Sequence, residues 1–126
     1  MNYQSFMKLK NQKHHFEKKE TGYHKYAVME LAKWVNGEAE KEFKMNGKTV
    51  FIPDVTCTQN GVITCVYEVC HSHPVDGYKL GMIQYWCYMN GTAITVYEVS
   101  ADYILSQLGR PERIETMECY TVNPFE

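Results

Sequence analysis

The sequence has no apolar run longer than a β-strand, so we expect no helix that crosses a membrane. Its first 19 residues are polar and basic, and they lack the apolar core and the small-residue cleavage site of a signal peptide. Internal repeats, linkers and low-complexity segments are also missing. With 126 residues, of which 44% are hydrophobic and 22% charged, the chain is expected to form one globular domain in the cytoplasm.

The cysteines lack the C-x-x-C spacing, and their number, five, is odd. In a reducing compartment, free and partly buried thiols are therefore expected. The five are Cys57, Cys65, Cys70, Cys87 and Cys119.

The formal net charge of −2 does not indicate a nucleic-acid-binding protein, but the charge is uneven along the chain. Basic residues gather before the first expected helix, and acidic residues dominate from Glu112 onward. This basic arm is either a solvated, frayed terminus or a segment that follows a phosphate backbone. Its residues are Lys8, Lys10, Lys13, His14, His15, Lys18 and Lys19, and Lys25 on the helix extends the candidate nucleic-acid contacts.

Periodicity predicts an α/β fold of the α+β type, in which a mixed central sheet is flanked by helices. The single domain would comprise an arm (1–19), a core (20–105) and a C-terminal addition (106–126). Thr21 is a candidate cap for the first helix, and Tyr26, Met29, Met82 and Met89 are expected in the core. The expected elements are helix 22–35, strands 38–45, 49–56 and 62–71, helix 75–89, strand 93–99, a short helix 103–108 and a weaker strand 114–122.

Two carboxylates flank a predicted hairpin. Asn60-Gly61 lies between two strand-like runs, which is a strong hairpin signal. The hairpin would bring Asp54 and Glu68 together, and two oxygen ligands on a rigid sheet suit Mg²⁺. Glu68 lies within a nearly continuous apolar run, where an unpaired carboxylate would be costly to bury. We therefore expect a metal-dependent site that cleaves phosphodiester bonds.

Several segments resemble a known family when they are taken in order. They are Glu20, His24 and Lys25, then Pro53-Asp54, then Tyr67-Glu68-Val69-Cys70-His71-Ser72-His73-Pro74, then Lys79-Leu80, and last Ile94-Thr95-Val96-Tyr97-Glu98-Val99. Together with the order of elements, they resemble the α-β-β-β-α-β core of the restriction-endonuclease-like superfamily, whose motif is PD-(D/E)xK. Within this superfamily, they resemble the branch of competence CoiA-like nucleases.

The resemblance implies a set of roles. Asp54 and Glu68 would bind Mg²⁺ or Mn²⁺, and the carbonyl of Val69 or Cys70 would complete the shell of protein ligands. Glu20 or His24 would approach from the opening helix. The bound ion would lower the pKa of a water molecule and neutralise charge on the phosphate.

The sequence departs from the family at Cys70, which stands where the motif has its lysine. A thiol does not supply a fixed positive charge. Lys79 on the following helix can reach back to replace it, and His71 or His73 can act as the base. Without such a substitute, the fold would bind a metal or nucleic acid but would not cut.

Other interpretations of the same residues involve zinc. His71-Ser72-His73-Pro74 resembles the H-S-H-P signature of JAMM-type zinc isopeptidases, but Gly81 and Gln84 occupy the positions of that family's Ser and Asp. A structural zinc site made of Cys65, Cys70, His71 and His73 is opposed by strand geometry, because Cys65 and Cys70 would face opposite sides of one strand.

Two function classes stay open. The first is a nuclease that acts on nucleic acid, DNA above all, with a homodimer as the default state. The second is an inactive nuclease-fold binding module, such as a phage or mobile-element protein that grips nucleic acid or a host protein. Cys70 and the acidic net charge favour the second. The two retained carboxylates favour the first, as do the nearby His24, Lys25 and Lys79.

Overall fold

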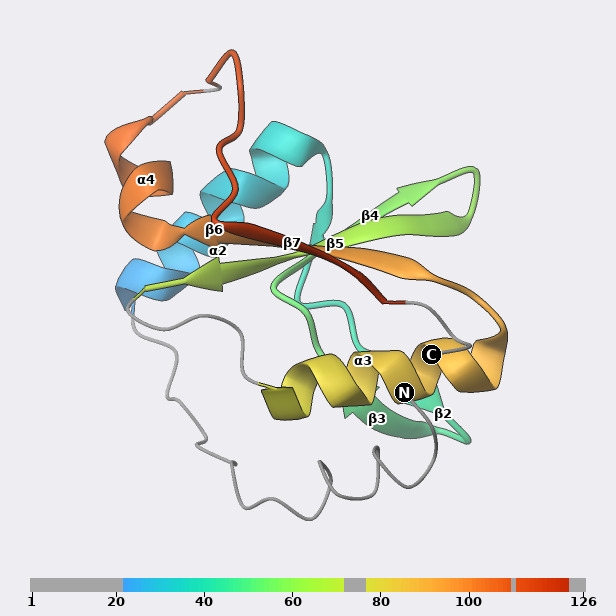
Figure 1. The fold of residues 1–126 in the computed structure, drawn as a ribbon. Coiled ribbons are helices and arrows are strands. Elements are labelled where there is room, and N and C mark those ends of the chain that lie inside the picture. Colours follow the sequence, from blue (N-terminus) through green and yellow to red (C-terminus); the bar gives the residue numbers. More distant parts are fainter. Residues whose placement is uncertain (1–21, 72–76, 110, 123–126) are drawn as a thin grey trace.

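The computed structural model describes residues 22–71, 77–109 and 111–122 (Figure 1). This part of the chain alternates between helices and strands, as the sequence predicts. The helices are α2 (Gly22–Val35), α3 (Gly77–Asn90) and α4 (Ala101–Ser106). The strands are β1 (Glu38–Ala39), β2 (Phe43–Met45), β3 (Lys48–Phe51), β4 (Val55–Gln59), β5 (Val62–Cys70), β6 (Ile94–Ser100) and β7 (Glu118–Val122).

The main sheet has five strands in the order β1-β4-β5-β6-β7. β5 and β6 are parallel and α3 lies between them in the sequence, whereas the other neighbours are antiparallel. The predicted mixed α/β architecture is therefore confirmed. The nearly continuous apolar β5 occupies the centre of the sheet, as expected for a strand that is covered on both faces.

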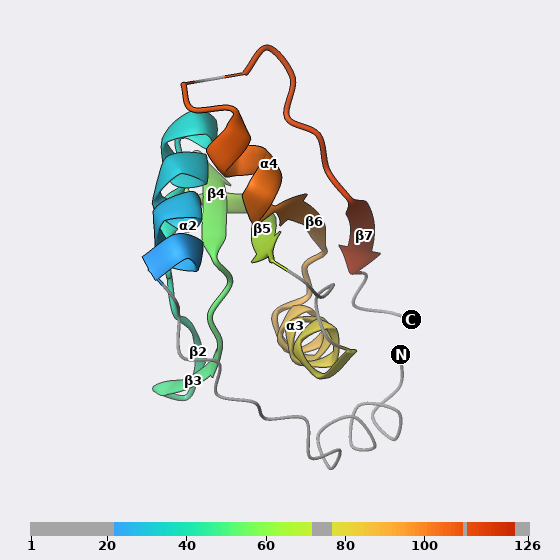
Figure 2. The same cartoon turned by 90° about the vertical axis from the view of Figure 1, so that its left-hand side faces the viewer.

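Helices cover both faces of the sheet (Figures 1 and 2). On one face, α2 and α4 pack over side chains such as Val55, Val69 and Val99. On the other face, α3 packs over Val66 and Val96, together with a separate hairpin of β2 and β3. Successive residues of a strand point to opposite faces, so each central strand supplies both cores.

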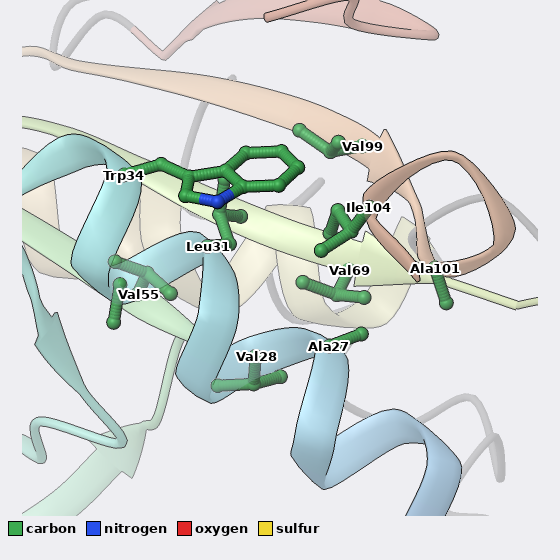
Figure 3. Close-up of a cluster of buried hydrophobic side chains, with 10 residues drawn as sticks. Ala27, Val28, Leu31, Trp34, Val55, Val69, Val99, Ala101 and Ile104 are labelled. Carbon is green, nitrogen blue, oxygen red and sulfur yellow. The ribbon is translucent and has the colours of Figure 1, made fainter. Parts of the chain in front are cut away.

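Helix α2 has the predicted bounds, and one side of it is buried. Its core stripe follows helical spacing and packs against the sheet (Figure 3). Burying one such leucine or valine contributes roughly 1.5–3 kcal/mol. The stripe comprises Ala27, Val28, Leu31, Ala32 and Trp34. Tyr26 and Met29 fall outside it, at 55% and 48% exposed, so the prediction that they lie in the core is wrong, as it is for Met89 at 53%.

A tight stop ends α2. Asn36 takes a left-handed φ of 52°, and the Gly37 N–H donates to Ala32 O at 2.9 Å. Gly37 then passes very close to the sheet, where a Cβ atom on it would lie 2.6 Å from Val55 Cγ1. The expected helix cap at Thr21 lies outside the described residues.

Two predicted strands are each divided into two. The expected strand 49–56 is interrupted at 52–54, because Pro53 has no N–H to continue a ladder. β3 before the break pairs with β2, and β4 after it pairs with β5. The expected strand 38–45 likewise becomes β1 and β2, which belong to different sheets.

The two hairpin turns are confirmed. Asn46-Gly47 and Asn60-Gly61 have positive φ angles of 52° and 77° and of 53° and 77°, as type I′ turns require. In the C-terminal part, the Ser100 hydroxyl accepts from the Tyr103 N–H and starts α4 two residues earlier than predicted. β7 begins at Glu118, later than the predicted start at residue 114. Among the described residues, no helix has the length and apolar character needed to span a membrane.

Candidate functional site

Asp54 lies in the bend that interrupts the strand, between β3 and β4. Its Oδ2 accepts the Val69 N–H of β5 at 2.7 Å and lies 3.4 Å from His24 Nε2 of α2. Burial alone would raise the pKa of this carboxyl. The hydrogen bond with His24, the charge of Lys79, the Val69 N–H and the charge of His24 outweigh burial and lower the pKa. Asp54 is therefore held as a carboxylate.

Glu68 lies in the middle of β5 and is only 3% exposed. Lys79 Nζ, from the first turns of α3, lies 2.8 Å from its Oε1 and 2.9 Å from its Oε2. Burial raises the pKa of Glu68 to about 8. Lys79 opposes this rise, and the charge of Asp54 and a hydrogen bond between the two carboxyl groups add to it. The expected burial of this carboxylate and its need for a cationic partner are thus confirmed.

Asp54 and Glu68 form an acidic pair at close range. They are near enough for the charge of Asp54 to raise the pKa of Glu68. Two carboxyl groups so placed do not both ionise easily, because like charges in a poorly hydrated site repel. The pair is therefore stabilised either by a shared proton or by a nearby cation. In this structure, Lys79 places its positive charge beside Glu68.

His24 connects α2 to this acidic pair through the backbone of Val69. The Nε2 atom of His24 lies 3.0 Å from Val69 O, and the Val69 N–H donates to Asp54. Both polar groups of the Val69 backbone are thus engaged at the site. The Val69 side chain points the other way, into the core under α2 (Figure 3).

Cys70 occupies the position of the motif lysine and is buried, at 6% exposed. It faces the same side of the sheet as Glu68, two residues earlier, as strand geometry predicts. Its thiol lies 3.9 Å from Glu68 O. Within the described ranges, the cationic partner of Glu68 is Lys79, one layer away on α3.

Sequence reasoning missed Glu98 as a neighbour of the site. Glu98 on β6 is fully buried, and it is the register partner of Glu68 in the parallel pair. Tyr120 of β7 is hydrogen-bonded to it. Burial and the charges of Glu98 and Glu118, followed by this hydrogen bond, raise the pKa of Tyr120. The available signal was a repeated tetrapeptide, Val66-Tyr67-Glu68-Val69 and Val96-Tyr97-Glu98-Val99, which the sheet aligns residue for residue.

Other predicted site residues are placed elsewhere or are not described. His71 is exposed at the end of β5, where it contacts the Tyr23 ring and lies 3.8 Å from Asp102. Lys25 is exposed on α2. Cys65 and Cys70 face opposite sides of β5, which removes the four-residue zinc site. The residues outside the described ranges are Glu20, His73, Lys8, Lys10, Lys13, Lys18 and Lys19.

The geometry thus brings Asp54, Glu68, Lys79 and His24 together from four elements or connections. Within residues 22–71, 77–109 and 111–122, no group of three or more His, Cys, Asp or Glu side chains is arranged to hold a metal ion. No family model matches the sequence, and neither a curated protein nor a solved structure shows significant similarity to it.

Proposed function

We propose that this protein is a metal-dependent nuclease that hydrolyses phosphodiester bonds in nucleic acid, with DNA as the first substrate to test. The observation that carries the proposal is the acidic pair of Asp54 and Glu68, together with the Lys79 ammonium group that contacts Glu68. Such a group combines oxygen ligands for a hard cation with a fixed positive charge for a phosphate.

The residues present fit Mg²⁺ or Mn²⁺. Glu68 Oε1 has no hydrogen bond of good geometry in the described structure, although Lys79 Nζ lies 2.8 Å from it. Asp54 and Glu68 would hold the ion, and the Val69 carbonyl, which lies 3.0 Å from His24 Nε2, is a candidate for a third oxygen. When bound, such an ion would lower the pKa of a water molecule and neutralise developing charge on the phosphate.

The protein groups have separable roles. His24 and the Val69 N–H fix the orientation of Asp54, and they keep it ionised for ligation. Lys79 replaces the motif lysine from the neighbouring helix, and its partly exposed side chain can turn from Glu68 to a substrate phosphate. Cys70 contributes no charge and fills the space beside the strand.

The architecture supports the finer assignment to a restriction-endonuclease-like core. A helix precedes an antiparallel pair, and a second helix then leads to a strand parallel to the central one. The carboxylates lie at the break before β4 and within β5, where the PD-(D/E)xK motif would place them. A cytoplasmic location, a homodimer and contacts from the basic arm belong to this proposal as well.

The direct test is a nuclease assay on single-stranded DNA, duplex DNA and RNA with Mg²⁺, with Mn²⁺ and with EDTA. Cleavage is expected only with a metal ion. Asp54→Asn and Glu68→Gln should each abolish cleavage and weaken Mn²⁺ binding in calorimetry, because each removes a negative ligand. Glu118→Gln, on the exposed part of β7, is the matched control and should leave both unchanged.

A binding module without catalysis is the second candidate, and the buried thiol at position 70 favours it. In that case the wild-type protein would cleave nothing and bind no divalent ion, yet it would retain a stoichiometric nucleic-acid or protein partner. Loss of that partner on Lys25→Glu would assign the binding surface to α2, where Lys25 is exposed. Cleavage that disappears in EDTA would exclude this candidate.

A further inference from the structure

Cys57 and Cys65 face each other across the β4–β5 hairpin. They are direct partners in the antiparallel register, and each thiol changes the pKa of the other. Both lie on the sheet face that α2 covers, but near the end of that helix, where Cys57 Sγ is 3.9 Å from Val35 O. Figure 1 shows that the tip of this hairpin extends beyond α2.

The register suits a disulfide bond. Opposed residues in an antiparallel pair have Cα atoms about 4.5 or 5.5 Å apart, and a disulfide accepts about 4.4–6.8 Å. The Cβ atoms of such a pair, about 4.5–5.5 Å apart, would have to approach by roughly 1 Å. A register shift directly beside the pair, between Cys57 and Thr58, leaves Thr64 without a partner in the ladder and allows this adjustment.

The pair differs from the other thiols in access and in chemistry. Cys57 and Cys65 are half-buried, whereas Cys70 and Cys87 are buried under the opposite face. Interaction with the neighbouring Cys57 thiol lowers the pKa of Cys65 to about 7 against the effect of burial, with help from Thr64 and Tyr67. The same interaction and burial raise the pKa of Cys57.

Two tyrosines lie on the same face of the sheet as the pair. Tyr67 of β5 and Tyr97 of β6 stack beside it, with ring centroids 5.1 Å apart. Burial and the neighbouring thiols raise the pKa of Tyr67 above its usual range, so this ring stays protonated when Cys65 ionises. One nucleophilic thiolate next to one protonated thiol is the arrangement that thiol–disulfide exchange uses.

We propose that Cys57 and Cys65 form a redox-active dithiol, which a low-molecular-weight disulfide converts into a reversible bond across the hairpin. The Cys65 thiolate attacks one sulfur of the disulfide and releases one equivalent of thiolate. Cys57 loses its proton to solvent and attacks Cys65 Sγ, which forms the Cys57–Cys65 bond and releases the second equivalent. The protein loses two electrons and two protons, and the small disulfide becomes two thiols.

This site is independent of the proposed nuclease chemistry, because Cys65 and Glu68 face opposite sides of β5. Incubation with glutathione disulfide is expected to remove two hydrogen atoms from the intact mass. Free thiols are then alkylated, and hydroxylamine cuts the chain between Asn60 and Gly61, among other Asn-Gly bonds. The piece containing Cys57 should remain joined to the piece containing Cys65 until a reductant is added.

Variants identify the roles of the two thiols. In the Cys57→Ser protein, the reaction should stop at a mixed disulfide between glutathione and Cys65. The Cys65→Ser protein should not form the bond across the hairpin. At pH 7, Cys65 should react about threefold faster than a thiol of ordinary pKa, since its larger thiolate fraction outweighs its lower nucleophilicity. Cys119→Ser, which removes an exposed cysteine, is the matched control and should change neither result.

The proposal is overturned if the wild-type protein keeps both hairpin thiols reduced while Cys119 takes up glutathione. It is equally overturned if the two pieces separate without a reductant. Return of the free thiols on addition of excess reduced glutathione supports a reversible bond, whereas a bond that resists it contradicts the redox assignment.

Discussion

Glu68 and Glu98 lie side by side on the parallel strands β5 and β6, both almost fully buried on the face that α3 covers. The two carboxyl groups have different polar partners. Lys79 of α3 contacts Glu68, and Tyr120 of β7 is hydrogen-bonded to Glu98. One acid therefore belongs to the candidate site with Asp54, and the other belongs to the framework that holds β7 on the sheet.

The framework role of Glu98 predicts a contrast between two substitutions. Glu98→Gln keeps the shape of the side chain and an acceptor for Tyr120, so the free energy of unfolding should change little. Glu98→Ala should lower it by about 1–3 kcal/mol, because it leaves the Tyr120 hydroxyl without this partner. Urea unfolding of Glu98→Ala, Tyr120→Phe and the double variant measures the coupling, which should be about 0.5 kcal/mol or more. Strictly additive effects would show that the two residues act independently.

Lys79 is predicted to supply the positive charge of the missing motif lysine. Lys79→Met should lower the cleavage rate on the order of 10²-fold, the usual cost of removing one electrostatic stabiliser. Lys33→Met, which removes an exposed lysine of α2, is the control. Adding Cys70→Lys to the Lys79→Met protein returns an ammonium beside Glu68 and should recover part of the rate. A Lys79→Met protein with full activity would remove Lys79 from the mechanism.

The raised pKa of Glu68 predicts how stability depends on pH when EDTA is present. An unfolded glutamate has a pKa of about 4.3, whereas the folded value is about 8. Between these values the folded state holds one more proton than the unfolded state. The stabilisation is therefore complete below the unfolded pKa and is lost as pH rises through about 8, with a slope of up to about 1.4 kcal/mol per pH unit.

Glu68→Gln isolates this contribution, because the amide does not titrate. Urea unfolding of both proteins at several pH values between about 5 and 8 should show a difference in stability that changes steadily with pH. A constant difference would mean that Glu68 ionises normally in the folded protein.

Gly37 is predicted to tolerate no side chain. In Gly37→Ala the new Cβ would lie 2.6 Å from Val55 Cγ1 and 3.0 Å from Thr56 O, so α2 must move away from the sheet. A loss of about 1–3 kcal/mol in thermal or urea unfolding is expected. Gly22→Ala at the start of the same helix meets no atom within 4 Å and should be neutral or slightly stabilising. Equal effects at the two glycines would contradict this packing.

Local signals in the sequence predicted the elements that depend on local chemistry. Helix α2 and the two Asn-Gly hairpins follow from side-chain periodicity, a left-handed stop and turn residues, and all are confirmed. The divided strands show where local reasoning fails. Pro53 lies in a run with strong strand propensity, yet the strand is interrupted there. Pro53 has no N–H to donate, and the segments before and after it belong to different sheets.

The candidate site was predictable in part. A carboxylate in the apolar run of β5 needs a partner, which identified Glu68 as a candidate, whereas Lys79 was predicted only as the substitute for the lysine missing at position 70. The neighbour relation between Glu68 and Glu98 depends on the parallel register, which propensity does not encode. The exposure of Met29 and Met89 likewise depends on how much of each helix the sheet covers.

The backbone of Val69 contacts both Asp54 and His24, and its side chain packs in the core under α2. A shift of this residue would therefore affect the site and the core together. A cavity in that core, such as Leu31→Ala would create, is expected to displace Val69 and with it Asp54, whose Oδ2 accepts the Val69 N–H. The position of Asp54 in the acidic pair therefore depends on how well the apolar side chains under α2 are packed.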